Sequence, residues 1–203
     1  DVLQFKADGS LDYRARKDTA GTATFDVLLQ DNGAAGGLNV NSAALFSVTI
    51  TIANVNDTPV AVTGNYVIDE GYSLNLNAGG SYDVDAPFGD TLTYAWDLNN
   101  DGDYLDAGEA AGNSPTRTIT WAQLVSLGIT APQTRTIKLR VSDNRNLPNS
   151  SAVVSATLQT LIVDYGDAPD TYGTLKGSNG AAHTISGSLL LGTTRDKETD
   201  GQP

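Results

Sequence analysis

The chain has 203 residues, of which 39% are hydrophobic and 18% are charged, a balance that is typical of one or two folded, soluble domains. Its 24 acidic residues outnumber 12 lysines and arginines, and the formal charge of −12 argues against nucleic acid or an anionic membrane surface as a partner. No cysteine is present, so disulfides, thiolate metal sites and cysteine nucleophiles are excluded. We expect bound cations to stabilise the fold instead.

The ends of the chain and its apolar runs bear on targeting. No run of apolar residues reaches the length of a membrane span, so we expect no membrane insertion. The amino end, Asp-Val-Leu-Gln-Phe, lacks the basic start and apolar core of a signal peptide. We therefore expect this chain to be an internal piece of a longer protein.

Short runs of alternating Val, Ile, Thr, Leu and Tyr, each bounded by Gly, Asn, Asp or Pro, recur along most of the chain. This pattern is typical of short antiparallel strands, and it predicts an all-β fold made of tandem β-sandwiches. A single helical turn or two is expected at residues 121–127, where an apolar face precedes Gly128. In chain order, we expect strands near residues 2–5, 11–15, 22–30, 46–53, 61–68, 73–77, 91–96, 116–120, 134–142 and 153–163.

Two changes in sequence character divide the chain. Residues 54–59 end a strand in amides and carboxylates, and Pro59 forbids a continuing ladder. After Val163 the hydrophobic periodicity fades, and Gly, Ser and Thr dominate. We therefore expect a partial β-sandwich at residues 1–58, a complete one at 59–163 and a partial β unit at 164–203. Half-sandwiches cannot bury both faces of a sheet, so the flanking units need strands from residues outside this segment or from another chain.

The residues from Asp97 to Glu109 form an acidic loop directly after a predicted strand. Asp97, Asn99 and Asp101, followed by Gly102, match the Asp-x-Asn-x-Asp-Gly start of an EF-hand calcium loop. Ligands that are all oxygen suit a hard cation such as Ca²⁺ rather than zinc. The loop therefore predicts a calcium site, and the alternative is a solvated acidic hairpin tip.

The second half of the loop departs from that template. Asp103 is expected to supply a backbone carbonyl, but the template's closing acid falls on Gly108. The closing ligand must therefore come from Glu109, one residue late, or from Asp106.

A second group of polar residues lies at the predicted hinge. A linker between sandwiches lies beside the end loops of the next domain, so its oxygens can share a cation with those loops, and the bound ion would make the joint rigid. The alternative is that Asp57 and Thr58 merely make a turn ahead of Pro59. The residues expected to share this cation are Asn56 and Asp57 with Glu70 and with Asp83, Asp85 or Asp90.

Three stretches carry resemblances to known families. Residues 9–59, which end in Asn-Val-Asn-Asp-Thr-Pro, resemble the second half of a bacterial cadherin-like repeat and its Asp-x-Asn-Asp-x-x-Pro calcium linker, with Asn54 in the first position. The central unit, with Ser-Tyr-Asp-Val-Asp at 81–85 and Leu-Arg-Val-Ser-Asp at 139–143, resembles the PKD-type immunoglobulin-like domain. The run Asp-Tyr-Gly-Asp-Ala-Pro-Asp at 164–170 resembles the opening of a GEVED domain. These resemblances imply non-catalytic parts of large bacterial surface or secreted proteins.

Catalysis and sugar binding have little support in the sequence. The sole histidine, His183, has no recognisable nucleophile elbow or metal-binding partner, so we expect no enzyme activity. Trp96 is expected to pack in a core. Carbohydrate contact is expected only if exposed aromatic residues line a face, the candidates being Trp121, Tyr72, Tyr82, Tyr94 and Tyr104.

These observations favour a calcium-stabilised structural or cell-adhesion segment of an exported bacterial protein, located outside the cell or at its surface. Its partners would be the neighbouring domains of the same polypeptide and an extracellular glycan or protein ligand. One alternative is an accessory carbohydrate-binding module of a secreted hydrolase. Another is a filament subunit, a homo-oligomer in which the incomplete ends exchange strands.

Overall fold

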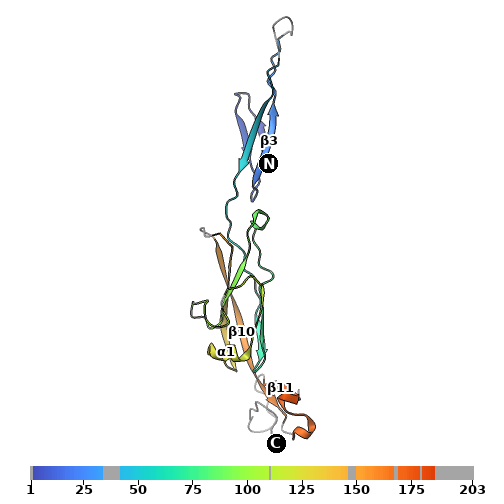
Figure 1. Cartoon of the computed structure of the whole chain (residues 1–203), viewed down its shortest axis with the longest axis vertical. Coiled ribbons are helices and arrows are strands. Elements are labelled where there is room, and N and C mark those ends of the chain that lie inside the picture. The colour runs from blue at the N-terminus through green and yellow to red at the C-terminus, as the bar shows by residue number, and fades with distance from the viewer. Residues whose placement is uncertain are drawn as a thin grey trace. The chain divides into compact units, whose positions relative to one another are not determined.

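The protein is described by a computed structural model that covers residues 2–33, 42–109, 111–145, 150–166, 169–178 and 180–185 (Figure 1). The described residues are mostly β-strand with one short α-helix, so the all-β prediction is confirmed. The chain packs into two compact units. We call Asp1–Asp57 with Val84–Gly89 the N-terminal unit, and Thr58–Asp83 with Asp90–Pro203 the main unit, and each is described by itself.

The N-terminal unit consists of two antiparallel ribbons and one 3₁₀ turn, η1 (Ala86–Phe88). The rings of Phe5 and Phe25 meet edge to face, with centroids 6.0 Å apart. None of the described side chains in the four strands is buried. Isolated two-stranded ribbons are marginally stable in water, so this unit has little core of its own. The ribbons pair β1 (Val2–Phe5) with β2 (Leu11–Arg14), and β3 (Gly21–Val27) with β4 (Phe46–Ile52).

The main unit contains two sheets that share one core. Adjacent strands of the larger sheet are antiparallel, except that β5 runs parallel to β10. The larger sheet follows the order β11 (Ala182–Ile185), β10 (Ser151–Tyr165), β9 (Gln133–Ser142) and β7 (Thr93–Asp97), with β5 (Tyr66–Asp69) on β10. The smaller sheet pairs β6 (Leu74–Asn77) with β8 (Thr116–Ile119), and the remaining elements are α1 (Trp121–Ser126), η2 (Asp170–Tyr172) and η3 (Lys176–Ser178).

The alternation of buried residues along β9 shows which face of the larger sheet packs in the core. Every second residue of β9 from Ile137 to Val141 is buried, and the neighbours between them are half-buried. Trp96 of β7 is only 2% exposed, and its ring meets that of Tyr66 edge to face, with centroids 6.1 Å apart. The interpretation of Trp96 as a core residue is therefore confirmed. Helix α1 adds Leu124 to the same core.

All ten predicted strands and the short helix are present, with shifts at their ends. The strand expected at residues 61–68 begins only at Tyr66, because the backbone N–H of Val62 donates to the Ser81 hydroxyl instead of joining a ladder. The strand expected to end at residue 163 continues to Tyr165. Residues 162–165 of this strand pair with β11, so the chain enters the expected third unit without a break in the strand.

Much of the expected unit at 164–203 lies outside the described residues, which include only 164–166, 169–178 and 180–185 of it. In the described part of the chain, no helix is long and apolar enough to cross a membrane.

Candidate metal centre

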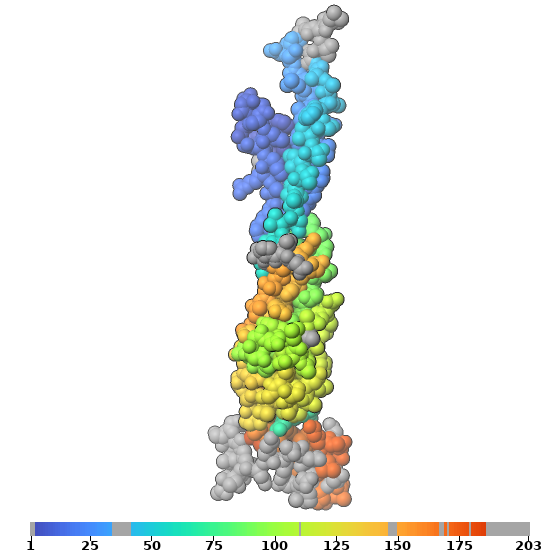
Figure 2. Space-filling model, turned by 60° about the vertical axis from the view of Figure 1, so that its left-hand side comes forward, coloured from blue at the N-terminus to red at the C-terminus, as the bar shows by residue number. Residues whose placement is uncertain are grey.

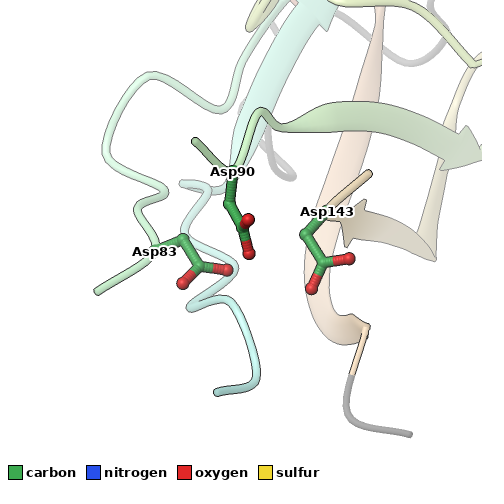
Figure 3. Close-up of side chains that lie close together, drawn as sticks. All are labelled: Asp83, Asp90 and Asp143. Carbon is green, nitrogen blue, oxygen red and sulfur yellow. The ribbon is translucent and has the colours of Figure 1, made fainter. Parts of the chain in front are cut away.

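Three buried carboxylates converge in the main unit. Asp83, Asp90 and Asp143 are each more than nine-tenths buried, and each offers an oxygen within 4.8 Å of the other two (Figure 3). We call them the aspartate triad. Within the described ranges, this is the one group of three acidic, histidine or cysteine side chains that comes so close together.

The antiparallel pairing of β7 and β9 explains how two members of the triad meet. Thr93, near the start of β7, lies opposite Ser142 at the end of β9. Asp90 precedes β7 and Asp143 follows β9, so both carboxylates lie at the same end of this strand pair. The backbone N–H of Thr91 donates to the side chain of Asn144 at 3.2 Å, which ties the two loops together.

Asp83 lies earlier than Asp90 in the same connection between β6 and β7. It follows Tyr82, which forms an antiparallel bridge with Val60. The N–H of Val60 donates to the carbonyl of Tyr82 at 2.7 Å, so the backbone just before Asp83 is held by two-way pairing with the segment after Pro59. The triad therefore joins the connection between β6 and β7, which carries Asp83 and Asp90, to the loop after β9, which carries Asp143.

One basic side chain contacts the triad directly at Asp90. The guanidinium of Arg145 donates from Nε to Asp90 Oδ1, and the Asp90 side chain has no exposed surface. The other oxygen of that carboxylate, Oδ2, is buried and has no hydrogen-bond partner in the described structure. Three buried carboxylates that lie this close together favour a bound positive charge. A divalent cation with oxygen ligands would neutralise them.

The structure places the other expected hinge residues elsewhere. Asp85 is buried in the N-terminal unit, where its Oδ2 accepts the backbone N–H of Asp57 at 2.7 Å. The side-chain amide of Asn56 donates to the carbonyl of Asp57 at 3.3 Å. These three residues thus gather around the backbone of Asp57.

Glu70 was expected to share a cation with Asp83, Asp85 or Asp90, and the structure does not bring it to the triad. Its backbone N–H donates to the carbonyl of Leu161, whereas Asp143 N–H donates to the carbonyl of Ser150 at the start of β10. The strand between those two contacts is about 35 Å long, at roughly 3.3 Å per residue. Glu70 lines a separate cavity with Trp121 and Lys176.

Asp97 organises the acidic loop that follows β7 in the main unit. Its side chain is fully buried, and its two oxygens accept the backbone N–H groups of Asp101 and Gly102, both at 3.1 Å. Lys138, directly opposite on β9, has its Nζ 3.6 Å from Asp97 Oδ2. In the space-filling view, the green loop that follows β7 stands at the surface (Figure 2).

The remaining expected ligands of the loop are distributed around Asn99. The side-chain amide nitrogen of Asn99 donates to Asp101 Oδ2 at 2.8 Å and to Asp106 Oδ2 at 2.9 Å. Asp103 is turned toward the backbone that follows it, since its Oδ1 accepts the N–H groups of Tyr104 and Leu105. The loop's carboxylates do not form a convergent group of three like the aspartate triad.

Glu109 lies beneath the loop with 0% exposure. Its Oε1 accepts the N–H groups of Leu98 at 2.6 Å and Asn99 at 3.3 Å, whereas its buried Oε2 has no hydrogen-bond partner in the described chain. Burial raises the pKa of the Glu109 carboxyl, the two backbone hydrogen bonds oppose that rise, and the charges of Asp106 and Asp97 add to it.

Sequence reasoning found Asp83 and Asp90 but missed Asp143 and Arg145 as members of this centre. Asp143 was noted only as the end of a motif shared with PKD-type domains. The signal that could have found it is its position: it is the first acid after the alternating strand β9, as Asp90 is the last acid before β7.

The aromatic candidates for sugar contact do not form one exposed face. Tyr94 and Tyr104 are buried, and the Tyr104 ring lies under the guanidinium of Arg140, whose carbon is 4.1 Å from the ring centroid. Tyr72 and Tyr82 are exposed, but the ammonium of Lys176 lies 5.8 Å from the centroid of Tyr72.

Comparison with known proteins gives no family. No protein-family model matches the chain, and no curated protein matches it. Among solved structures, it is similar to a nucleoside hydrolase-related hypothetical protein from Saccharophagus degradans that is associated with carbohydrate metabolism, at 23% identity and a TM-score of 0.35. That alignment covers 53% of this chain and 26% of the other, so this chain spans about a quarter of that protein's length. A likeness at this TM-score carries no argument about function.

Proposed function

We infer that this chain is a calcium-stabilised, non-catalytic structural or adhesive segment of an exported, multidomain bacterial protein. The single observation that carries the inference is the aspartate triad, in which Asp83 and Asp90 of the β6–β7 connection meet Asp143 of the loop after β9 inside the main unit. Buried carboxylates at such distances repel one another unless positive charge lies between them. Oxygen ligands in flexible loops suit calcium, at affinities of about 10⁻⁴ to 10⁻³ M in extracellular modules.

The architecture proposed for the main unit is an immunoglobulin-like β-sandwich of the PKD type. Two sheets share one core, with Trp96 of β7 at its centre, and this arrangement supports that proposal. The N-terminal unit, whose described residues form two ribbons without a buried strand side chain, is proposed to be part of a cadherin-like sandwich. Segments of this kind act as spacers or adhesive modules rather than as enzymes.

A cation at the triad would stabilise the folded main unit by mass action, since the unfolded chain does not hold Asp143 beside Asp83 and Asp90. The stabilisation is about 1.4 kcal/mol when calcium exceeds its Kd tenfold. For a protein of this size, that corresponds to a shift in Tm of about 3–6 °C. The effect belongs to divalent cations, because an equal ionic strength of sodium chloride only screens the charges.

The test is thermal unfolding with calcium, with chelator and with sodium chloride of equal ionic strength. Asp143→Asn should reduce the calcium-induced rise in Tm. The matched control is Asp12→Asn, which removes the same charge from an exposed residue of the N-terminal unit. Equal calcium shifts in the wild-type chain and in Asp143→Asn, or a shift reproduced by sodium chloride, would overturn the proposal.

A second candidate function is a filament subunit, and the exposed apolar residues of the N-terminal unit favour it. Large apolar side chains stay in contact with water because each ribbon lacks neighbouring strands. A strand donated by a further copy would cover them. The exposed residues are Leu3, Phe5, Leu28, Leu29, Leu45 and Phe46. Sedimentation at increasing concentration should then show association that Phe46→Ser weakens, whereas a monomer at all concentrations would exclude this candidate.

A further inference from the structure

In the acidic loop between β7 and Glu109, a side-chain amide lies between two carboxylates, a position that would suit a cation. Asn99 Nδ2 donates to one carboxylate oxygen of Asp101 and to one of Asp106, at 2.8 and 2.9 Å. Two like charges therefore meet at a neutral nitrogen that carries only a partial positive charge. A carboxamide presents oxygen instead of nitrogen after a rotation of 180° about its last bond. Asn99 Oδ1 now accepts the backbone N–H of Asp101 at 3.1 Å, a bond that the rotation gives up. The rotated amide would complete a group of three oxygens.

A second observation points to a ligand at the same loop. Glu109 is 0% exposed, its Oε1 is held by the N–H groups of Leu98 and Asn99, and its Oε2 is buried without a hydrogen-bond partner in the described residues. A buried carboxylate oxygen without a donor or a cation destabilises the folded state, because it has lost its hydration without a compensating interaction. The backbone N–H of Asn99 holds the other oxygen of this carboxylate, so the unsatisfied oxygen belongs to the same loop as the Asn99 side chain.

We propose that this loop binds a second divalent cation of the calcium class through side-chain oxygens of Asn99, Asp101 and Asp106, with Glu109 closing the site from below. The bound ion takes the position now held by the Asn99 amide nitrogen. Asp97 is a positioning residue: both its oxygens accept N–H groups of the loop, which bends the backbone around it. The ligand chemistry is all oxygen, so a hard cation is selected over zinc.

Binding at this loop has a structural consequence for the larger sheet. The loop carries Tyr104, which is buried with its ring under Arg140, and Lys138 approaches Asp97 from the same strand. Lys138 and Arg140 alternate with the core residues of β9, so they lie on the sheet face away from the core. A cation that fixes the loop would therefore hold it down on the outer face of β9.

This second site is separate from the aspartate triad. The triad lies at the end of the strand pair where β7 begins, beside Thr93 and its partner Ser142. The acidic loop begins at Asp97, at the other end of β7. The two sites share no residue. The inference adds a site to the proposed calcium stabilisation but does not rest on the triad, so each can fail without the other.

The experiment is a titration of the whole chain with Tb³⁺, a luminescent ion of calcium's size and ligand preference, followed by displacement with Ca²⁺. Tyr104 lies within the loop, so its ring is placed to sensitise an ion bound there. We expect saturable luminescence that calcium displaces. The double variant D101N/D106N should weaken Tb³⁺ binding by more than about a hundredfold, since loss of even an outer partner of a metal site costs about 10–100-fold.

The matched control is D12N/D26N, which removes two exposed carboxylates of the N-terminal unit that belong to neither proposed site, and it should leave the sensitised signal and its affinity unchanged. Circular dichroism of each variant establishes that it is folded. Should D101N/D106N fail to fold, Asn99→Asp provides the second test, because an added carboxylate should tighten binding. Tb³⁺ affinity that is unchanged in both D101N/D106N and Asn99→Asp, or one that falls equally in D12N/D26N, would overturn the second site. Neither result would change the chelator-dependent melting that tests the triad.

Discussion

The guanidinium of Arg145 pairs with the carboxylate of Asp90 and thereby joins the loop after β9 to the loop before β7. Arg145 is the basic partner of the buried Asp90. Its positive charge and that of a bound cation would therefore both offset the negative charge of the triad. This relationship makes the role of the triad measurable.

The variant Arg145→Gln removes the positive charge while keeping a polar side chain of similar length. Without calcium, we expect a loss of about 1–3 kcal/mol in the free energy of unfolding, below the usual cost of breaking a fully buried pair because Arg145 itself is partly exposed. With calcium, the ion should replace the missing charge, so the calcium-induced rise in Tm should be larger than in the wild-type chain. Calorimetry in calcium and in chelator measures both. A calcium shift that does not grow would show that the triad is balanced without an ion.

Glu109 predicts a pH dependence that is measured in chelator. Burial raises its pKa in the folded chain, so the folded state holds the proton more tightly than the unfolded state does. Stability from this group is therefore fully present below the ordinary pKa of glutamate, and it is lost as the pH rises through the raised pKa of the folded state. Glu109→Gln cannot ionise and should flatten that part of the profile. Chemical unfolding between pH 4 and 8 would contradict this if both chains showed the same slope.

Trp96 predicts the cost of emptying the core. It is 2% exposed and packs against Tyr66, so Trp96→Ala should lower the free energy of unfolding by about 3–5 kcal/mol. The control is Tyr172→Ala, since that ring is 79% exposed and its loss should stay within about 0.5 kcal/mol. Urea denaturation followed by far-UV circular dichroism measures both variants. Similar losses for the two would argue against a core centred on Trp96.

The N-terminal unit should exchange its backbone hydrogens faster than the main unit does. No described side chain in β1 to β4 is buried, so little apolar contact opposes the opening of the ribbons. Hydrogen exchange of peptides from β3 and β4 should be complete well before that of peptides from β9 and β10. If strands are donated between copies, protection in β3 and β4 should rise with protein concentration. Slow exchange at every concentration would show that the unit is stable without a partner.

The sequence was most informative where one side of a strand faces the core. The alternation from Thr134 to Ser142 predicted β9 to within one residue, because burial of every second side chain leaves a direct trace in the residue order. It was least informative where local contacts replace a ladder, as at Val62, whose N–H binds the Ser81 hydroxyl. No pattern of alternating residues encodes such a contact.

The two candidate sites also differ in how far the sequence could reveal them. The acidic loop is local in sequence, so its composition and spacing could be recognised, including the displaced acid at Glu109. The triad depends on the register of β7 with β9, which brings Asp143 to Asp90 across more than fifty residues of chain. Register follows from packing and turn geometry along both strands, so a single sequence did not show that Asp143 belongs there. Calcium binding at either place stays a prediction.

The parallel pairing of β5 with β10 has a mechanical consequence. These are the first strand of the larger sheet in sequence and its longest strand, and they run side by side over Tyr66–Asp69 and 158–161. Tension that pulls the start of β5 and the far end of β10 in opposite directions would load all the hydrogen bonds between them together, in shear, instead of opening them one at a time. A module connected in this way would yield late under load, as a tether between two surfaces must.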